Sequence, residues 1–563
     1  MKYTRRKTIS VNVGGVMIGS DYPIRVQSMT NTTTTDIEAS VAQCRRIAEA
    51  GGEIVRLTAQ GVREADAIGQ IRAKLRGEGC NVPLVADIHF NPRAAFAAAQ
   101  VTDKVRINPG NFVDPARQFK RVEYSDEEYA AELGRIREAL LPFIALCREH
   151  GTAVRLGVNH GSLSDRIMSR YGNTAAGMVE SVMEFLRVFK AERFEQVVIS
   201  MKASNVVVMV ESVQLLVRAM DREDMHYPLH LGVTEAGFGE DGRIKSAVGI
   251  GTLLSQGLGD TIRVSLSEDP EAEIPVARKL VDYITSRSGD DTCDDDDETA
   301  YEIAPQRRIT TVVNGNIGGG KPPVVLASGE RGSLQTELQP DYYPQSDATV
   351  HWAEVTADTP VDKLPEIQPD TVLVVTPSGA NVPGSQISFI RRVKDAGIEC
   401  PVIVKNTYAD TDREWLQVKA GADLGAVMMS GLADGVWLDA PSYADRAEVV
   451  SIAYSILQAT RQRISHTEFI SCPGCGRTMF DLQTTVRRVK EATQHLRHLK
   501  IGVMGCVVNG PGEMADADYG YVGAARHKIS LYRGKECVEK NIPEEDAIER
   551  LLGLIESDSR TER

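Results

Sequence analysis

The sequence predicts an α/β protein with three parts: an N-terminal TIM (β/α)8 barrel, a central insert resembling part of an α/β barrel, and a C-terminal α+β domain. Short apolar runs alternate eight times with amphipathic segments before residue 288. An acidic stretch then interrupts the pattern, and cysteines at ligand spacing appear only near the end. A chain of 563 residues is too long for one core. We therefore expect a barrel over 1–288, a linker over 289–299, an insert over 300–460 and a cysteine-bearing domain over 461–563.

The barrel region opens with a predicted β-hairpin over 8–20, where alternating apolar residues flank Gly14 and Gly15. Eight strands should follow, at 25–29, 54–58, 84–89, 105–108, 154–159, 197–202, 229–235 and 261–265. Helical periodicity marks 37–50, 127–149, 176–189 and 206–220 between them. The number of units and their total length are typical of a TIM barrel. A doubly wound sheet is disfavoured because no G-x-G-x-x-G follows the first strand.

Cations stand at the carboxyl ends of five of these strands, where barrel enzymes carry their active sites. They are Arg56, Arg106, Arg155, Lys202 and Arg263. Cations that converge repel one another unless an anion lies among them, and this set suits a diphosphate better than a single carboxylate. We therefore expect a pocket for a phosphorylated anion.

The same strand ends offer Asp87, His89, Asn159, Glu235 and Ser265. Asp87 and Glu235 could simply neutralise two of the cations, and His89 could be a structural histidine. We count Asp87 and His89 among the expected substrate contacts. The cations around Glu235 should hold it ionised in the empty site.

The predicted linker over 289–299 is rich in aspartate and has no apolar period. Beyond it, strands are expected at 324–326, 350–352, 372–375, 402–404 and 426–429, and helices at 388–396 and 444–457. Gly315 to Lys321 fits G-x-x-x-x-G-K, but Pro322 stands where the motif requires Ser or Thr. A loop is therefore expected there, and not a nucleotide site.

The C-terminal part brings three cysteines and a glutamate toward one centre. Cys472 and Cys475 share a tight turn, Cys506 follows a strand-like run, and a turn after it returns Glu513 toward the thiols. An iron–sulfur cluster with one exchangeable oxygen ligand, a zinc site and redox thiols all remain open on spacing, although zinc ribbons usually repeat C-x-x-C. A helix at 482–496, strands at 501–504, 521–524 and 528–532, and a helix at 544–555 complete the expected α+β domain.

SCPGCGRT at 471–478 and GCVVNGPGE at 505–513 resemble the cluster domain of the 4-hydroxy-3-methylbut-2-enyl diphosphate synthase family. VQSMTNT at 26–32, VADIHF at 85–90, RLGVNHGSL at 155–163, SMKAS at 200–204 and HLGVTEAG at 230–237 are similar to its barrel. The resemblance implies a [4Fe–4S] cluster held by Cys472, Cys475, Cys506 and Glu513, with Glu513 also catalytic. It implies that Glu235 is an acid.

The resemblance also implies the reaction. The substrate would be 2-C-methyl-D-erythritol 2,4-cyclodiphosphate, opened with two electrons and dehydroxylated to 4-hydroxy-3-methylbut-2-enyl diphosphate in isoprenoid biosynthesis. Ferredoxin or flavodoxin would supply the electrons, and the insert would be a spacer, as in the longer family variant. The family's substrate contacts correspond here to Arg56, Arg106, Arg155, Asn159, Lys202, Arg263 and Ser265. The alternative is a zinc-dependent TIM-barrel enzyme acting on a phosphorylated small molecule.

Composition limits the other classes of function. A net charge of −14 argues against a general nucleic-acid binder, and no apolar run approaches the length of a membrane span. Nine cysteines in this length are too few for a disulfide scaffold. We therefore expect a cytoplasmic enzyme, a monomer or a homodimer, with no nucleic-acid or membrane partner.

Overall fold

The computed structural model describes residues 3–114, 123–287, 307–364, 367–496, 498–507, 510–514 and 516–561, the side chains of 559–561 excepted. The chain divides into two compact units. We call Arg6–Gly242, Gly259–Arg278 and His466–Arg563 the barrel unit, and Met1–Arg5, Arg243–Leu258 and Lys279–Ser465 the insert unit. The predicted linker over 289–299 lies outside the described residues, as do 300–306 of the predicted insert and 508–509 of the GCVVNGPGE motif.

The barrel unit begins with the predicted hairpin, in which β1 (Val11–Val13) and β2 (Val16–Ile18) pair antiparallel. Its apolar side chains Val11, Val13 and Ile18 are fully buried against Ile54 and Val85, near the amino ends of two barrel strands. The hairpin therefore closes the amino-terminal end of the barrel.

The eight predicted barrel strands are confirmed, the last two being shorter than expected. They are β3 (Arg25–Met29), β4 (Ile54–Ala59), β5 (Leu84–Ile88), β6 (Lys104–Ile107), β7 (Ala153–Asn159), β8 (Val197–Lys202), β9 (His230–Leu231) and β10 (Thr261–Ile262). They form one parallel sheet in the order β8-β7-β6-β5-β4-β3-β10-β9. A parallel bridge between Ile199 and Leu229 joins β8 to the segment entering β9 and closes the ring. All carboxyl ends therefore meet at one mouth.

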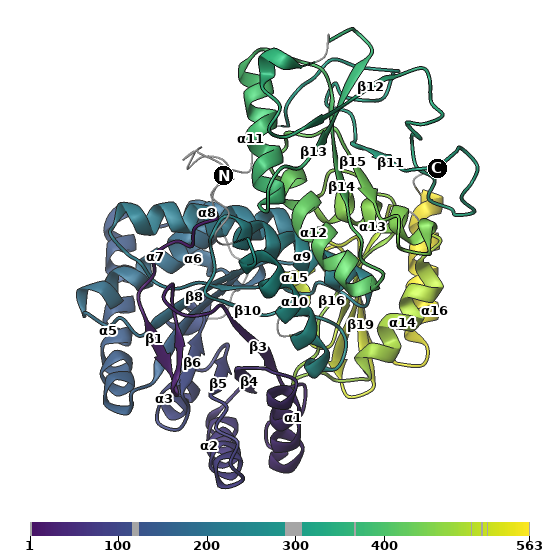
Figure 1. Cartoon of the computed structure of the whole chain (residues 1–563). Coiled ribbons are helices and arrows are strands. Elements are labelled where there is room, and N and C mark those ends of the chain that lie inside the picture. Colours follow the sequence, from purple (N-terminus) through teal and green to yellow (C-terminus); the bar gives the residue numbers. More distant parts are fainter. Residues whose placement is uncertain are drawn as a thin grey trace. The chain divides into compact units, whose positions relative to one another are not determined.

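The helices that connect these strands are α1 (Ile37–Glu49), α2 (Val62–Gly77), α3 (Pro92–Ala99), α4 (Pro109–Phe112), α5 (Asp126–His150), α6 (Asp165–Tyr171), α7 (Ala175–Ala191), α8 (Val206–Arg222), α9 (Glu240–Ser255) and α10 (Glu273–Thr285) (Figure 1). Four of them, α1, α5, α7 and α8, form where the apolar spacing predicts them, and the other helices had no predicted range. Side chains at their amino ends accept backbone N–H groups that have no partner within the helix. Asp36 caps α1 in this way and Ser125 caps α5.

The C-terminal part of the barrel unit is the expected α+β domain. Its sheet runs β16 (Glu468–Ser471), β17 (Lys500–Met504), β18 (Tyr519–Ala525), β19 (Lys528–Arg533) and β20 (Glu536–Pro543), parallel from β16 to β18 and antiparallel beyond. Its helices are α14 (Leu482–Thr493), α15 (Gly510–Glu513) and α16 (Ala547–Thr561). β16 and β20 were not among the predicted strands. The cysteines follow the carboxyl ends of the parallel strands β16 and β17.

The insert unit holds a second parallel sheet, in the order β11-β15-β14-β13-β12. Its strands are β11 (Val324–Leu326), β12 (His351–Thr356), β13 (Thr371–Thr376), β14 (Val402–Thr407) and β15 (Gly435–Asp439), with helices α11 (Val382–Asp395), α12 (Arg413–Met429) and α13 (Arg446–Ala459). This is the strand order of a barrel opened between β11 and β12, as the predicted partial barrel implies.

One predicted strand of the insert is wrong. Residues 426–429 form the end of α12, and the fifth strand is β15. α12 is buried on nearly all sides, so its last turns carry the continuous apolar run that is typical of a buried strand. Close packing explains this burial: Gly421 lies against Ala247, and Gly425 against Val248, both on the part of α9 that belongs to the insert unit.

In the described part of the chain, no helix is both long and apolar enough to span a bilayer.

Candidate active site

One pocket of the barrel unit lies where the mouth of the barrel meets the cysteine-bearing strand ends. Every predicted substrate contact, Glu235 and the three cysteines of the two motifs line it. Its atom-free space, including open solvent at the entrance, is about 720 Å³. The lining residues are Met29, Arg56, Asp87, His89, Arg106, Arg155, Asn159, Lys202, Thr234, Glu235, Arg263, Ser265, Cys472, Pro473, Gly474, Cys475, Arg477, Met504, Gly505, Cys506 and Gly510.

Asp87 is shared by three of the arginines. Its carboxylate accepts a hydrogen bond from Arg106 Nη1 at 3.2 Å, and it lies 3.7 Å from Arg155 Nη2 and 4.0 Å from Arg56 Nε. Burial alone would raise the pKa of Asp87, but these cations lower it well below 3.8. Asp87 therefore acts as an internal counter-ion, the simpler of the two roles open to it from sequence.

Arg263 has its own counter-ion, which sequence reasoning missed. Its Nε and Nη2 donate to the two carboxylate oxygens of Glu273, at 3.0 and 2.8 Å. Glu273 opens α10 and is 1% exposed, so the pair is buried and bidentate. This pairing fixes the plane of the Arg263 guanidinium.

The remaining cations have little compensation. Burial and the charges of Arg56, Arg155 and Arg263 lower the pKa of Lys202 well below its usual range. Beneath the pocket, Lys104 is fully buried and its Nζ has no hydrogen-bond partner among the described residues. Burial, then Arg155 and Arg56, lower the pKa of Lys104 to about 7. Burial and the neighbouring cations therefore disfavour the charged form of both lysines in the empty pocket, and a bound anion would favour it.

Several buried donors in the pocket also have no acceptor. Within the described residues, the Nε atoms of Arg56, Arg106 and Arg155 make no hydrogen bond. Leaving such groups buried and unpaired is costly, so native structures supply a partner. A polyanion with many acceptor oxygens would complete this set.

His89 is a poor candidate for a cationic acid. Burial, then Arg106 and Arg477, lower its pKa well below 6.5, so its ring is neutral near pH 7. A neutral imidazole can still donate or accept one hydrogen bond at the pocket wall.

The three cysteines converge because their strands are neighbours. Ser471 of β16 pairs with Val503 of β17, so Cys472 and Cys506 emerge side by side. Cys475 returns to them through a turn in which Gly474 has φ +80° and the Cys475 N–H donates to Thr478 Oγ1. Burial raises the pKa of Cys472 to about 12, and the hydrogen bond that the Gly505 N–H donates to Cys472 Sγ at 3.2 Å opposes this effect.

Glycines let this motif approach the barrel mouth closely. A Cβ at Gly512 would lie 2.5 Å from the carbonyl oxygen of Gly161, and one at Gly476 would lie 2.6 Å from that of Thr32. Ser267 adds a hydrogen bond to the carbonyl of Cys472 at 2.9 Å. The cysteines and the barrel cations therefore face one pocket within a single chain.

Glu513 lies beside Glu235 but is not itself among the residues that line the pocket. Thr234 Oγ1 donates to Glu513 Oε2 at 3.1 Å, while Glu513 Oε1 is buried without a hydrogen-bond partner among the described residues. Burial and the nearby charge of Glu235 raise the pKa of Glu513 well above 4.5.

Glu235 differs from the expectation drawn from the cations alone. Burial raises its pKa above 4.5, and the opposing effects of Thr234, Arg263 and Lys202 are smaller. Its backbone has φ +50°, a strained value for a glutamate and one that often marks functional positions. The side chain is thus held at the mouth by a conformation that costs free energy.

Arg477 is the functional candidate that sequence reasoning missed. It is nearly buried, and although burial alone would lower its pKa, Cys475, Asp87 and Cys506 raise it. Arg477 therefore interacts both with the cysteines and with Asp87 of the anion pocket. The signal was present, because Arg477 stands two residues after Cys475 in SCPGCGRT.

The donors at this site fit an iron–sulfur cluster. Three thiols line one pocket, a backbone N–H already bonds one sulfur, and the Glu513 oxygen without a partner is available as a fourth ligand. This fit is one of donor type and shared location only, because in the described chain these side chains do not form a group of three or more His, Cys, Asp or Glu that could hold a metal ion.

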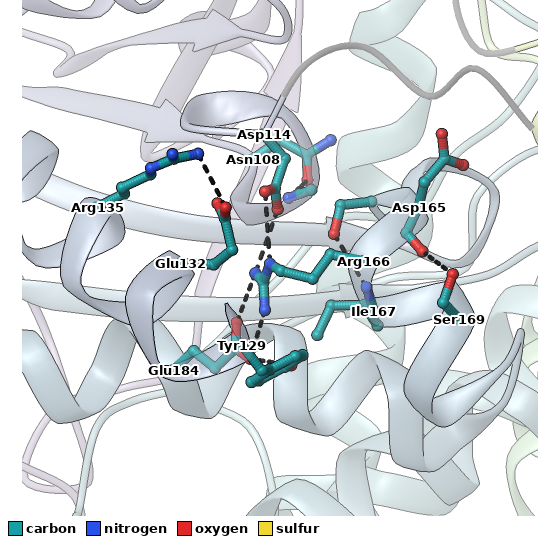
Figure 2. Close-up of polar contacts among 12 residues, drawn as sticks. Asn108, Asp114, Tyr129, Glu132, Arg135, Asp165, Arg166, Ile167, Ser169 and Glu184 are labelled. Carbon is teal, nitrogen blue, oxygen red and sulfur yellow. Dashed lines mark hydrogen bonds and ion pairs between the residues drawn. The ribbon is translucent and has the colours of Figure 1, made fainter. Parts of the chain in front are cut away.

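A second buried network braces the loops that follow β6 and β7. Arg166 of α6 donates to both carboxylate oxygens of Glu184 at 2.8 Å and to Asp114 Oδ2 at 3.2 Å (Figure 2). Asn108, at the end of β6, donates to Ser162 Oγ at 2.9 Å, which ties the two loops together. None of these residues lines the described pocket.

Comparison with known proteins agrees with this geometry. A family model described as the GcpE TIM-barrel domain matches residues 8–278, and one described as the GcpE protein C-terminal domain matches 468–557. The 4-hydroxy-3-methylbut-2-en-1-yl diphosphate synthase (flavodoxin) of Bacteroides fragilis is 54% identical over 99% of this chain and 96% of its own length. The enzymes of the same name from Porphyromonas gingivalis and Akkermansia muciniphila are 49% and 44% identical, over 98% and 99% of this chain and 97% of their own lengths. The chain therefore belongs to the family of 4-hydroxy-3-methylbut-2-en-1-yl diphosphate synthases.

Proposed function

We propose that this chain reduces 2-C-methyl-D-erythritol 2,4-cyclodiphosphate with two electrons to 4-hydroxy-3-methylbut-2-enyl diphosphate. The observation that carries the proposal is that thiols and under-compensated cations line the same buried pocket. A cyclic diphosphate supplies the missing anion, and its carbon skeleton can then lie between the cations and the thiols. The names of the relatives, which specify a diphosphate product, support the same reaction.

The residues divide into two groups by role. Arg56, Arg106, Arg155, Lys202 and Arg263 bind the diphosphate, while Asp87, His89, Asn159 and Ser265 complete the cavity wall. Cys472, Cys475, Cys506 and Glu513 would hold a [4Fe–4S] cluster, whose redox chemistry supplies electrons one at a time when it is bound.

Proton delivery is assigned to Glu235. Its carboxyl lines the pocket and lies beside Glu513, so it is placed to give a proton to the hydroxyl that leaves as water. The close fit of the cysteine motif over the barrel mouth excludes water from the reacting carbons.

Flavodoxin is proposed as the electron donor because the relatives carry it in their names. Zinc has no redox chemistry at such a site, so a zinc-dependent barrel enzyme would have no use for an electron carrier and is not favoured. All eight described cysteines are free thiols, which supports a reducing, cytoplasmic setting. We further propose that the insert over 300–460 is a non-catalytic spacer.

Anaerobic reconstitution tests the proposal. Protein purified without oxygen should contain iron and acid-labile sulfide, and with reduced flavodoxin it should convert the cyclodiphosphate to the linear diphosphate. Absence of iron and sulfide, or unchanged substrate in the presence of a loaded cluster and strong reductant, would contradict it.

A further inference from the structure

Gly157 on β7 lies where a cation from the neighbouring strand needs space. A Cβ at this position would stand 2.4 Å from Nε of Arg106, 3.0 Å from its Cγ and 3.2 Å from its Cδ. Arg106 starts on β6 and donates from Nη2 to the Gly157 carbonyl at 2.8 Å. The arginine side chain therefore occupies the volume that any larger residue at 157 would fill.

The arrangement recurs two strands further round the barrel. A Cβ at Gly232, just after β9, would lie 2.7 Å from Nζ of Lys202, which belongs to β8. In both cases a cation leans sideways from one strand into a gap left by a glycine on the next. Neither glycine has a positive φ, so backbone conformation does not explain its presence.

Arg106 is held in place by burial and by two acceptors. It is among the largest fully buried side chains, and it is bonded to Asp87 as well as to Gly157. A methyl group at 157 would push the guanidinium from both acceptors, and so change the direction in which its free donors face the cavity.

We propose that Gly157 and Gly232 are positioning residues that set where Arg106 and Lys202 hold the diphosphate. This inference rests on the proposed function, since it assigns the gaps to the same anion site. The glycines touch no substrate themselves; they act through the cations that lie across them.

The test for Gly157 is a double-mutant cycle read by binding of inorganic pyrophosphate to cluster-loaded protein. Gly157→Ala should raise the Kd about tenfold or more, roughly what one misplaced charge-assisted hydrogen bond costs. In an Arg106→Ala background the same change should alter Kd by less than about twofold, because the clashing side chain is gone. Equal losses in both backgrounds would mean that Ala distorts the strand, and would overturn the inference.

Two controls keep the result interpretable. Gly134→Ala on α5, where an added Cβ meets nothing within 4 Å, should leave Kd unchanged. In turnover assays Gly157→Ala should raise KM in step with Kd while kcat stays within about threefold, which a general loss of folded protein would not produce.

Gly232 provides an independent test of the proposal. Gly232→Ala should also weaken pyrophosphate binding, but a Lys202→Met background should relieve only part of the effect, because the Arg263 carbonyl oxygen also lies 2.8 Å from the added Cβ. No relief at all would remove Gly232 from the proposal. Wild-type protein that fails to bind pyrophosphate would instead overturn the anion pocket itself.

Discussion

Replacing Asp87 by Asn removes the carboxylate shared by three buried guanidiniums. At an effective dielectric constant of about 20, each separation between 3.2 and 4.0 Å corresponds to an attraction of about 4–5 kcal/mol. Much of this only offsets the cost of burying the charges, and removing one partner from a buried pair costs about 3–5 kcal/mol. At about 2 °C per kcal/mol for a large unit, the apparent melting temperature should fall by about 6–10 °C.

Thermal unfolding followed by circular dichroism measures this loss, with and without inorganic pyrophosphate. A ligand present at a hundred times its Kd adds about 2.7 kcal/mol of stability. Because the Asn variant has a more positive pocket, pyrophosphate should bind it more tightly and raise its melting temperature more than that of wild type. Asp21→Asn is the control, since Asp21 is exposed and has only weak contacts, with exposed Lys7 at 3.9 Å and with Ser20 Oγ at 3.5 Å, among the described residues.

The pH dependence has a defined sign. The folded-state pKa of Asp87 is depressed, so its stabilising effect is present above the unfolded value and is lost only as pH falls through the folded one. The difference in melting temperature between wild type and Asp87→Asn should therefore stay constant from about pH 8 to about pH 5 and become smaller only below about pH 4. Equal melting temperatures at neutral pH, or weaker pyrophosphate binding by the variant, would refute the counter-ion role.

Four further predictions concern the cysteine motif, the acid and the assembly of the site. Cys475→Ser should lose iron and sulfide while circular dichroism shows a folded barrel, and full iron in this variant would exclude Cys475 as a ligand. Glu513→Cys should keep iron but lose turnover, because a thiolate is a tighter ligand than a carboxylate. Wild-type turnover in this variant would exclude the proposed role of Glu513. Glu235→Gln should bind substrate normally and lose turnover about a hundredfold or more; a raised KM with normal kcat would argue against an acid. Mixing an Arg106→Ala, Arg155→Ala double variant with Cys475→Ser should give no activity, because both halves of the pocket lie in one compact unit of one chain; recovered activity would show sites shared between subunits.

The barrel could be predicted because its signals are local. Each strand is a short apolar run bounded by turn residues, and a parallel barrel places all the strand ends at one mouth once the strands are counted. Cations at successive strand ends such as Arg56, Arg106 and Arg155 must then converge, whatever their separation in the sequence. The prediction for 426–429 failed for the converse reason. An apolar run inside a fully buried helix carries no mark of its period, and β15 begins with a glycine and is only five residues long.

Charge compensation in the pocket could not be predicted in the same way. That Glu273 would pair with Arg263 depends on how far α10 turns back over β10, and no spacing rule encodes that distance. The raised pKa of Glu235 depends on burial, which exists only after the C-terminal part covers the mouth. The sequence therefore shows which charged groups come together in the pocket. Their protonation, in contrast, depends on how far packing excludes solvent from them.

The β-hairpin at the start of the chain affects how substrate enters the pocket and how product leaves it. Since Val11, Val13 and Ile18 close the amino-terminal end of the barrel, substrate reaches the pocket from the end where the strands carry their carboxyl termini. Product must leave by the route through which substrate enters, and a diphosphate product presents the same charge to the same cations. The linear diphosphate should therefore compete with the cyclic one, and flux through the enzyme should depend on how quickly the next step of metabolism removes what has just left.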